Sequence, residues 1–288
     1  MDSPSNSTSR RPALPRSGEQ IELVDLSQDH PGFNDPVYRA RRDEIAAIAA
    51  HHTFGDPIAE VPYLPDEQAV WQHVWERLAP LHREHAIDEY LEGAERFGFD
   101  HDYIPSFSEI NARLSALEGF CLEPVAGLVR PETFLRHLGE RRFLATQYMR
   151  HHSQPLYTPE PDVVHEYIGH VPTLAHPDLA ALNLAFGDAA TRTDDPADFA
   201  ALIRVYWYTI EFGILHDGDR LRVYGAGILS SFGELGRYHE AQLRPWDLEV
   251  MARAEFDPTK YQAQLFVAPP FPRLRDELRE WLDDIAGA

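Results

Sequence analysis

Pro155-Leu-Tyr-Thr-Pro-Glu-Pro-Asp-Val-Val-His165-Glu166-Tyr-Ile-Gly169-His170-Val-Pro172 is the stretch around which the chain is best understood. It places two histidines five residues apart, with a glutamate directly after the first. Imidazole and carboxylate groups are side chains that bind divalent transition metals. We therefore interpret this stretch as the centre of a metal site, and we expect the surrounding fold to hold it.

The spacing of the two histidines does not fit one face of an α-helix. Each residue turns the helix by about 100°, so His165 and His170 would lie about 140° apart. The zinc-protease motif H-E-x-x-H uses a shorter spacing, which places both rings on one face. Gly169 loosens the backbone, and Pro172 disfavours helical geometry at Val171. We therefore expect His170 at a fraying helix end, where its ring can turn back toward His165.

A third ligand is indicated in segment 201–213, which reads Ala-Leu-Ile-Arg-Val-Tyr-Trp-Tyr-Thr-Ile-Glu-Phe-Gly. Glu211 is a charge in an apolar and aromatic segment, and a buried charge is normally paired or bound to a metal. Arg204 lies about two helical turns away, which is distant for a direct pair. Two histidines, one carboxylate and open coordination positions are typical of non-haem Fe(II) oxygenases. These residue types favour His165, His170 and Glu211 as ligands of one iron ion.

Other interpretations stay open from the residues alone. A zinc-dependent hydrolase could use the same HExxGH segment, with Glu166 as its general base. A lone motif also carries a real risk of a false positive, in which the two histidines are unrelated surface residues. A binding protein without catalytic activity is a third class, and a complete set of three ligands argues against it.

The composition narrows the range of partners. The chain has 288 residues with 47 acidic and 26 basic side chains, which gives a formal net charge of −21. Phosphate binding needs a basic surface, so we expect neither nucleic acid nor an anionic membrane as a partner. No apolar run approaches the length of a membrane-spanning helix. The single cysteine, Cys121, excludes an intramolecular disulfide and fits a reducing compartment, which we expect to be the cytoplasm.

We predict a mostly helical fold with short strands, in a single catalytic domain over residues 21–288. Residues 1–20 are rich in Ser, Pro and Arg, and they are predicted to be a disordered tail. Ser106 with Glu109 predicts a capping box, and Asp195 predicts the start of the helix that carries Glu211. Helices are predicted at 36–51, 65–86, 87–97, 106–117, 176–190, 197–212 and 272–285, with another starting at 131. Short strands are predicted at 220–224 and 264–267.

Long motifs in the same order resemble the pterin-dependent aromatic amino acid hydroxylases. The resemblance covers roughly residues 100–270, and it is greatest to the short bacterial phenylalanine hydroxylases. Its residues are Tyr157-Thr-Pro-Glu-Pro-Asp162, His165-Glu166-x-x-Gly169-His170-Val-Pro172, Tyr206-Trp207-Tyr-Thr-Ile-Glu211-Phe-Gly213 and Tyr224-Gly-Ala-Gly-Ile-Leu-Ser-Ser-Phe-Gly-Glu234-Leu, with Gly127-Leu-Val129 and Thr146-Gln-Tyr-Met-Arg150-His upstream.

This resemblance implies the catalytic-domain fold of that family and its chemistry. Fe(II), a tetrahydropterin and dioxygen are the implied cofactors, the pterin being tetrahydrobiopterin or a bacterial analogue. The implied reaction hydroxylates the ring of a free aromatic amino acid, with L-phenylalanine to tyrosine as the main expectation. Trp207 and the apolar Val267 favour phenylalanine. Hydroxylation at the meta position and hydroxylation of tryptophan are the alternatives.

The resemblance also assigns roles to single residues. Leu128 and Val129 are expected to bind the pterin through their backbone, Phe134 to stack on its ring, and Glu166 to reach it through water. Arg150 is expected to bind the substrate carboxylate, as guanidinium groups bind carboxylates in a bidentate manner. The other residues assigned to the substrate pocket are Tyr157, Thr158, Pro161, Asp162, Trp207, Ser230 and Glu234.

The assembly expected from the sequence is a monomer. No sustained heptad pattern follows residues 272–285, so the tetramerising helix of animal family members is not expected here. The first hundred residues do not fit a separate regulatory domain. The expected partner is therefore a small aromatic amino acid.

Overall fold

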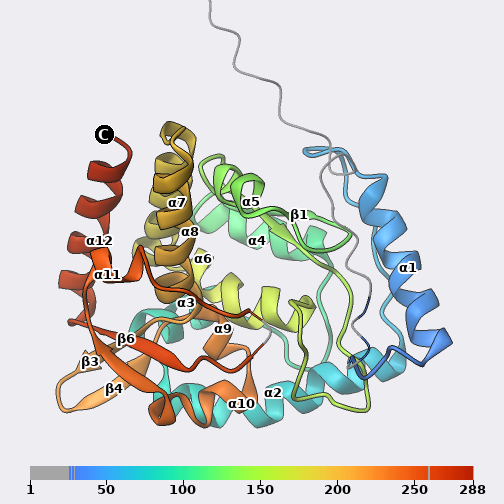
Figure 1. Ribbon diagram of the computed structural model, residues 1–288. Coiled ribbons are helices and arrows are strands. Elements are labelled where there is room, and N and C mark those ends of the chain that lie inside the picture. Colours follow the sequence, from blue (N-terminus) through green and yellow to red (C-terminus); the bar gives the residue numbers. More distant parts are fainter. Residues whose placement is uncertain (1–25, 27, 29, 259, 288) are drawn as a thin grey trace, which may run out of the picture.

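The computed structural model describes residues 26, 28, 30–258 and 260–287. Within these residues the fold is mainly helical with short strands (Figure 1). Helices α6 (Val171–Ala175) and α9 (Ala226–Leu229) lie near the middle of the view, whereas α1 (Pro36–Ala50) and α12 (Phe271–Ile285) lie at opposite edges. The predicted fold class is confirmed. The tail predicted over residues 1–20 falls outside the described residues, and the domain predicted over 21–288 stays a prediction.

The remaining elements follow in chain order. The other α-helices are α2 (Pro65–His85), α3 (Asp88–Phe97), α4 (Phe107–Leu117), α5 (Pro131–Leu138), α7 (Pro177–Arg192), α8 (Pro196–Tyr206), α10 (Phe232–Leu235) and α11 (Leu248–Met251). Two π-helical turns, η2 (His165–His170) and η3 (Trp207–Glu211), adjoin α6 and α8, and η4 (Tyr238–Glu240) is a 3₁₀ turn. The strands are β1 (Cys121–Pro124), β2 (Arg142–Ala145), β3 (Ile214–Asp217), β4 (Arg220–Val223), β5 (Gln242–Pro245) and β6 (Gln264–Ala268).

Side-chain caps set the helix starts that the sequence predicts. The Ser106 hydroxyl accepts a hydrogen bond from the backbone N–H of Glu109, whose carboxylate accepts one from the Ser106 N–H. This is the predicted capping box of α4. The Asp195 carboxylate accepts from the N–H groups of Ala197 and Asp198 at the start of α8. Both predicted starts are confirmed.

The strands form two small sheets. Strands β1 and β2 pair in parallel, with Cys121 opposite Arg142. The second sheet has the order β4-β3-β6-β5, in which β3 and β4 form an antiparallel hairpin and the other pairs are parallel. Strand β3 follows η3 after a short connection, so this sheet extends directly from the turn that ends at Glu211.

One large apolar core joins the helices from α2 to α12. The buried His82 ring on α2 hydrogen-bonds the Leu229 carbonyl at 2.7 Å, which ties α2 to α9. Among the described residues, no helix combines the length and the apolar character that a bilayer crossing needs.

The fraying helix end predicted at His170 is wrong. The backbone is wound through η2 and continues directly into α6, and Val171 has helical dihedral angles of −56° and −41°. Pro172 stands in the first turn of α6, where a missing N–H costs little. In an α-helix the Ile168 carbonyl would accept from residue 172, which as a proline has no N–H. The Tyr90 hydroxyl of α3 donates to this carbonyl at 2.7 Å and so replaces the missing donor.

We predict that Tyr90→Phe destabilises the fold by about 1–3 kcal/mol, because a buried carbonyl then loses its donor. Tyr224→Phe is the matched control. Both tyrosines are 1% exposed, and within the described chain the Tyr224 hydroxyl has no hydrogen-bond partner. Urea denaturation measures both free energies of unfolding. Equal losses for the two variants would contradict the role given to Tyr90.

The buried His82 predicts a loss of stability in acid. Burial lowers the pKa of His82 from 6.5 to about 4. Between these two pH values the unfolded chain binds the proton and the folded chain does not, so the free energy of unfolding decreases as the pH falls below 6.5. We expect protonation of this side chain in the unfolded state to lower the free energy of unfolding by about 2 kcal/mol at pH 5.

The variant His82→Gln isolates this contribution from the other titrating groups. It lowers stability at pH 7, because the ring packing is lost, but it has a shallower decrease between pH 7 and pH 5. Urea midpoints across that range measure the difference. If the stability of wild type and variant decreased equally between pH 7 and pH 5, the contribution assigned to His82 would be refuted.

Candidate active site

Two π-helical turns carry the three predicted metal ligands. In η2 the Val171 N–H donates to the Glu166 carbonyl, and in η3 the Phe212 N–H donates to the Trp207 carbonyl at 2.8 Å. Each bond spans five residues, one more than in an α-helix. Side chains five residues apart therefore come to the same face. The histidine spacing that does not fit an α-helix fits this winding.

The structure brings His165, His170 and Glu211 together. The Nε2 atoms of the two histidines are 3.0 Å apart. The Glu211 carboxylate lies 3.2 Å from His170 Nε2 and 3.7 Å from His165 Nε2. One ligand atom from each residue lies within 4.8 Å of the others, a spacing that can hold one metal ion. His170 is buried, whereas 16% of the His165 side chain and 13% of the Glu211 side chain remain exposed, so the cluster is open on one side.

The charge states of these residues suit a divalent cation. Burial, together with the neighbouring His170, lowers the pKa of His165 to about 4. Burial alone would raise the pKa of Glu211, but the two imidazoles hold it below its ordinary value. A neutral imidazole and an ionised carboxylate are the forms that bind metals.

Ser230 orients the first histidine, a contact that the sequence reasoning missed. The Ser230 oxygen lies 2.9 Å from His165 Nδ1, and its hydroxyl donates to the Ala226 carbonyl at 2.8 Å. With its own proton used on Ala226, the Ser230 oxygen accepts from His165 Nδ1–H. The lone pair of His165 is therefore on Nε2, toward the cluster. The predicted contact of Ser230 with a substrate stays a prediction.

Gly169 has a packing role that differs from the flexibility expected of it. A Cβ atom at this position would lie only 2.8 Å from the Ala226 carbonyl oxygen. Glycine therefore lets α9 approach η2 closely. This approach brings Ser230, which directly follows α9, to the His165 ring.

Glu166 lies beside the cluster but is held by another residue. Its Oε1 atom accepts hydrogen bonds from the backbone N–H and the hydroxyl of Thr146, both at 3.0 Å. Burial raises the pKa of Glu166 to about 7. The side chain is thus neither a member of the metal cluster nor a free surface acid.

The predicted carboxylate binder, Arg150, is paired with Asp162. Its Nε and Nη2 atoms donate to the two Asp162 oxygens at 2.9 and 2.8 Å, and both side chains are almost fully buried. Asp162 also accepts from the backbone N–H of His165 at 3.1 Å. Among the described residues, the Arg150 Nη1 atom donates only to the Pro155 carbonyl, at 3.4 Å, so it has capacity for a further acceptor. Asp162 therefore connects the guanidinium to the turn that carries the histidines.

The other predicted pocket residues come from three segments. In the loop before η2, Tyr157 is 40% exposed, the Thr158 hydroxyl donates to the Glu160 carbonyl, and the Pro161 carbonyl accepts from Thr146. Trp207 begins η3, and Glu234 is buried in α10.

The predicted pterin wall lies on the segment from β1 to α5. The apolar side chain of Leu128 is 42% exposed, although residues 122–127 before it are buried. Val129 and Phe134 are partly buried. The Phe134 ring contacts Phe143 and Tyr206 edge-on, with ring centroids 5.2 and 5.7 Å away. The exposed side chain of Leu128 therefore leaves apolar surface open in this segment.

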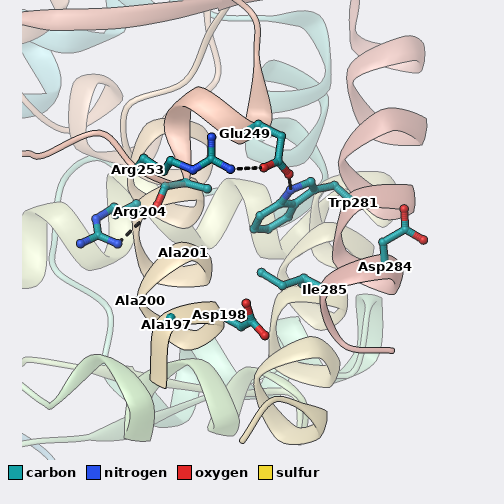
Figure 2. Close-up of a pocket in the computed structure, with 11 residues that line it drawn as sticks. Ala197, Asp198, Ala200, Ala201, Arg204, Glu249, Arg253, Trp281, Asp284 and Ile285 are labelled. Carbon is teal, nitrogen blue, oxygen red and sulfur yellow. Dashed lines mark hydrogen bonds and ion pairs between the residues drawn. The ribbon is translucent and has the colours of Figure 1, made fainter. Parts of the chain in front are cut away.

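A separate pocket of about 730 Å³ lies between α8, α11 and α12 (Figure 2). In this pocket the Glu249 carboxylate bridges the Arg253 guanidinium at 2.9 Å and the Trp281 indole N–H at 3.2 Å. None of the predicted site residues lines it. We therefore assign the candidate chemistry to the histidine cluster and not to this pocket.

The chain is similar to a known protein family and to several of its characterised members. The family model described as biopterin-dependent aromatic amino acid hydroxylase matches residues 19–287. The chloroplastic phenylalanine 4-monooxygenase of Chlamydomonas reinhardtii is 48% identical over 212 residues, which are 74% of this chain and 58% of that protein. Human tyrosine 3-monooxygenase is 41% identical over 267 residues, 91% of this chain and 50% of that protein. The chain thus spans between half and three fifths of the length of these two curated relatives.

The fold of the chain is also similar to that of solved structures. A crystal structure of phenylalanine hydroxylase from Chromobacterium violaceum, with bound iron(III) and the oxidised cofactor 7,8-dihydrobiopterin, matches with a TM-score of 0.70. Its sequence identity is 34%, and the match covers 77% of this chain and 84% of that chain.

The contact between Ser230 and His165 predicts the effect of a single substitution. Ser230→Ala removes the group that orients the ring, so we expect the affinity for Fe(II) or Co(II) to fall by about 10- to 100-fold. Ser231→Ala is the matched control, because its hydroxyl caps α10 and does not touch the cluster. We expect it to lose about 1 kcal/mol of stability with little change in metal affinity. Anaerobic titration calorimetry measures both affinities, and similar values for the two variants would refute the prediction.

Proposed function

The chain belongs to the biopterin-dependent aromatic amino acid hydroxylase family, and on this premise we propose that it is an iron- and tetrahydropterin-dependent monooxygenase. The proposed reaction hydroxylates the ring of L-phenylalanine to give tyrosine. The observation that carries the proposal is the convergence of two imidazoles and one carboxylate on a single point. This is the ligand set of non-haem Fe(II) oxygenases.

His165, His170 and Glu211 would hold the Fe(II). The protonation states of His165 and Glu211, and the spacing of all three side chains, support this assignment. When bound, ferrous iron and a reduced pterin supply the electrons that activate dioxygen for insertion of one oxygen atom into the ring. The chain's own contribution is to bind, orient and enclose the reactants.

The pterin would lie along Leu128 and Val129, with Phe134 against its ring. The exposed Leu128 side chain and the partly buried Phe134 ring support this placement. Glu166 would contact the pterin through water. With a pKa of about 7, its carboxyl can donate or accept a hydrogen bond at neutral pH.

The substrate carboxylate would bind the Arg150 guanidinium. Asp162 fixes the plane of this guanidinium through two hydrogen bonds, and a carboxylate could approach from the Nη1 side. Tyr157, Thr158 and Pro161 come from the same loop and would shape this end of the pocket. The remaining proposed pocket residues are Trp207, Ser230 and Glu234.

Phenylalanine is the proposed substrate for two reasons. The algal relative and the bacterial structure are both named for phenylalanine hydroxylation. The apolar Val267 and the indole of Trp207 also favour an unsubstituted benzene ring. The named 4-monooxygenase activity of the algal relative supports hydroxylation at the para position over the meta position. The family match argues against a zinc-dependent hydrolase.

We also propose that the enzyme acts in a reducing compartment such as the cytoplasm, which its single cysteine supports. The monomer expected from the sequence stays a prediction, and sedimentation velocity would measure it directly.

A comparison of the turnover rates of three amino acids tests the proposed function. The protein is loaded with Fe(II) without air, then given tetrahydropterin, air and one of phenylalanine, tyrosine or tryptophan, and the products are identified by mass and retention time. We expect phenylalanine to be turned over fastest. Turnover of tryptophan at an equal or higher rate would overturn the choice of substrate, and iron-loaded protein without pterin-dependent oxygen uptake would overturn the reaction class.

Removal of one metal ligand tests the site. His165→Ala is expected to abolish turnover and to weaken iron binding, because two ligands and an open face hold the ion poorly. His216→Ala is the matched control, since His216 is exposed in β3 only five residues after Glu211. Iron content and initial rates are measured for both. Full activity of His165→Ala would remove this histidine from the site.

A further inference from the structure

Trp207 is contacted by Phe256 and Gln262, which lie between α11 and β6. The Phe256 ring stacks on the Trp207 indole, with centroids 4.3 Å apart and planes 14° apart. The Trp207 Nε1–H donates to the side-chain oxygen of Gln262 at 2.9 Å. The connection between α11 and β6 therefore contacts the indole both on its face and at its polar edge.

The Gln262 side chain is itself fixed. It is 8% exposed, and its amide nitrogen donates to the carbonyls of Asp257 and Lys260 at 3.2 and 3.0 Å. All these bonds use the amide in one orientation, with oxygen toward Trp207 and nitrogen toward its own loop. Gln262 is thus a rigid acceptor for the indole.

The same residue contacts a second side chain of the proposed pocket. The Gln262 backbone N–H donates to the Glu234 carboxylate at 3.0 Å. Glu234 lies on α10 and Trp207 on η3, and these two elements are separate in the chain. Gln262 is therefore a bridge between two residues assigned to the substrate.

The position of the indole also bears on the metal cluster. Trp207 is the first residue of η3, and its carbonyl accepts the five-residue hydrogen bond from Phe212. Glu211 is the last residue of this turn. A side chain that fixes Trp207 therefore also helps to fix the position of the pocket wall relative to Glu211, the predicted metal ligand at the end of the same turn.

We propose that Gln262 is a positioning residue that sets the orientation of the Trp207 indole and thereby the fit of the aromatic substrate. This inference rests on the proposed function, because it takes Trp207 as a wall of the substrate pocket. Without the Gln262 acceptor, the indole N–H is left unpaired in a partly buried place and the ring leaves its present orientation. Gln262 acts through Trp207 and does not need to touch the substrate.

The test is a double-mutant cycle with Gln262→Met and Trp207→Phe. Methionine keeps the length of the side chain but loses the acceptor, and phenylalanine keeps a ring but has no N–H to satisfy. The main measurement is the dissociation constant of L-phenylalanine on Fe(II)-loaded protein without air. We expect Gln262→Met to weaken binding about tenfold in the wild-type background. In the Trp207→Phe background the same change is expected to alter binding by less than about twofold.

Three further measurements separate positioning from a general loss of structure. Gln264→Met removes an amide two residues away, which donates to the Tyr208 hydroxyl and not to Trp207, and it is expected to leave substrate binding unchanged. The affinity for Fe(II) should stay within about twofold in Gln262→Met, because its changed bond is to the indole and not to a metal ligand. The ratio of kcat/KM for phenylalanine to that for tryptophan should fall, since a misplaced indole discriminates less between rings.

The outcomes decide the two proposals separately. Wild-type protein that binds phenylalanine but does not hydroxylate it contradicts the proposed function and leaves the Gln262 comparison intact. Unchanged phenylalanine binding in Gln262→Met overturns the positioning role, as does a tenfold effect that persists in the Trp207→Phe background. If Gln262→Met proves too unstable to measure, Trp207→Phe can still be compared with the double variant, because neither protein contains the orphaned indole N–H. A tenfold difference in phenylalanine binding between these two proteins would overturn the positioning role.

Discussion

Two backbone hydrogen bonds that each span five residues hold the site together. One closes η2 between Val171 and Glu166, and the other closes η3 between Phe212 and Trp207. A π-helical turn is less favourable than an α-helical one, so it persists where the surrounding structure stabilises it. Here the Tyr90 hydroxyl donates a hydrogen bond to the Ile168 carbonyl, and α9 packs closely against Gly169 in η2. The rings and the carboxylate meet because the helices around them support this winding.

The polar groups around the cluster form connected chains and not isolated pairs. Asp162 joins Arg150 to the backbone of His165, and Ser230 joins the His165 ring to α9. A buried ion pair contributes little net stability by itself, because desolvation offsets much of the attraction. Its value here is geometric, since it fixes a guanidinium relative to a predicted metal ligand. A free amino acid bound by Arg150 would then have its ring directed by the same framework that holds the histidine cluster.

Much of this architecture follows from local signals. The capping box at Ser106, the cap at Asp195 and the helical periodicity of α2 are properties of short segments, so they can be predicted without knowledge of the fold. The choice of His165, His170 and Glu211 followed from residue chemistry, because few side chains bind a divalent metal and an isolated acid in an apolar helix needs a partner. The family motifs then assigned the pterin and substrate residues, none of which could be derived from spacing.

The sequence by itself therefore determined the helical class, the family and the types of the predicted metal ligands, since each depends on neighbouring residues or on motif identity. Only the tertiary structure decided how His165 and His170 come to share a face, because the π-helical winding depends on support from α3 and α9. It also decided that Ser230 accepts from His165 and that Gln262 bridges Trp207 and Glu234. These pairs lie 65, 55 and 28 residues apart, and no local pattern encodes a contact that forms only when distant helices pack.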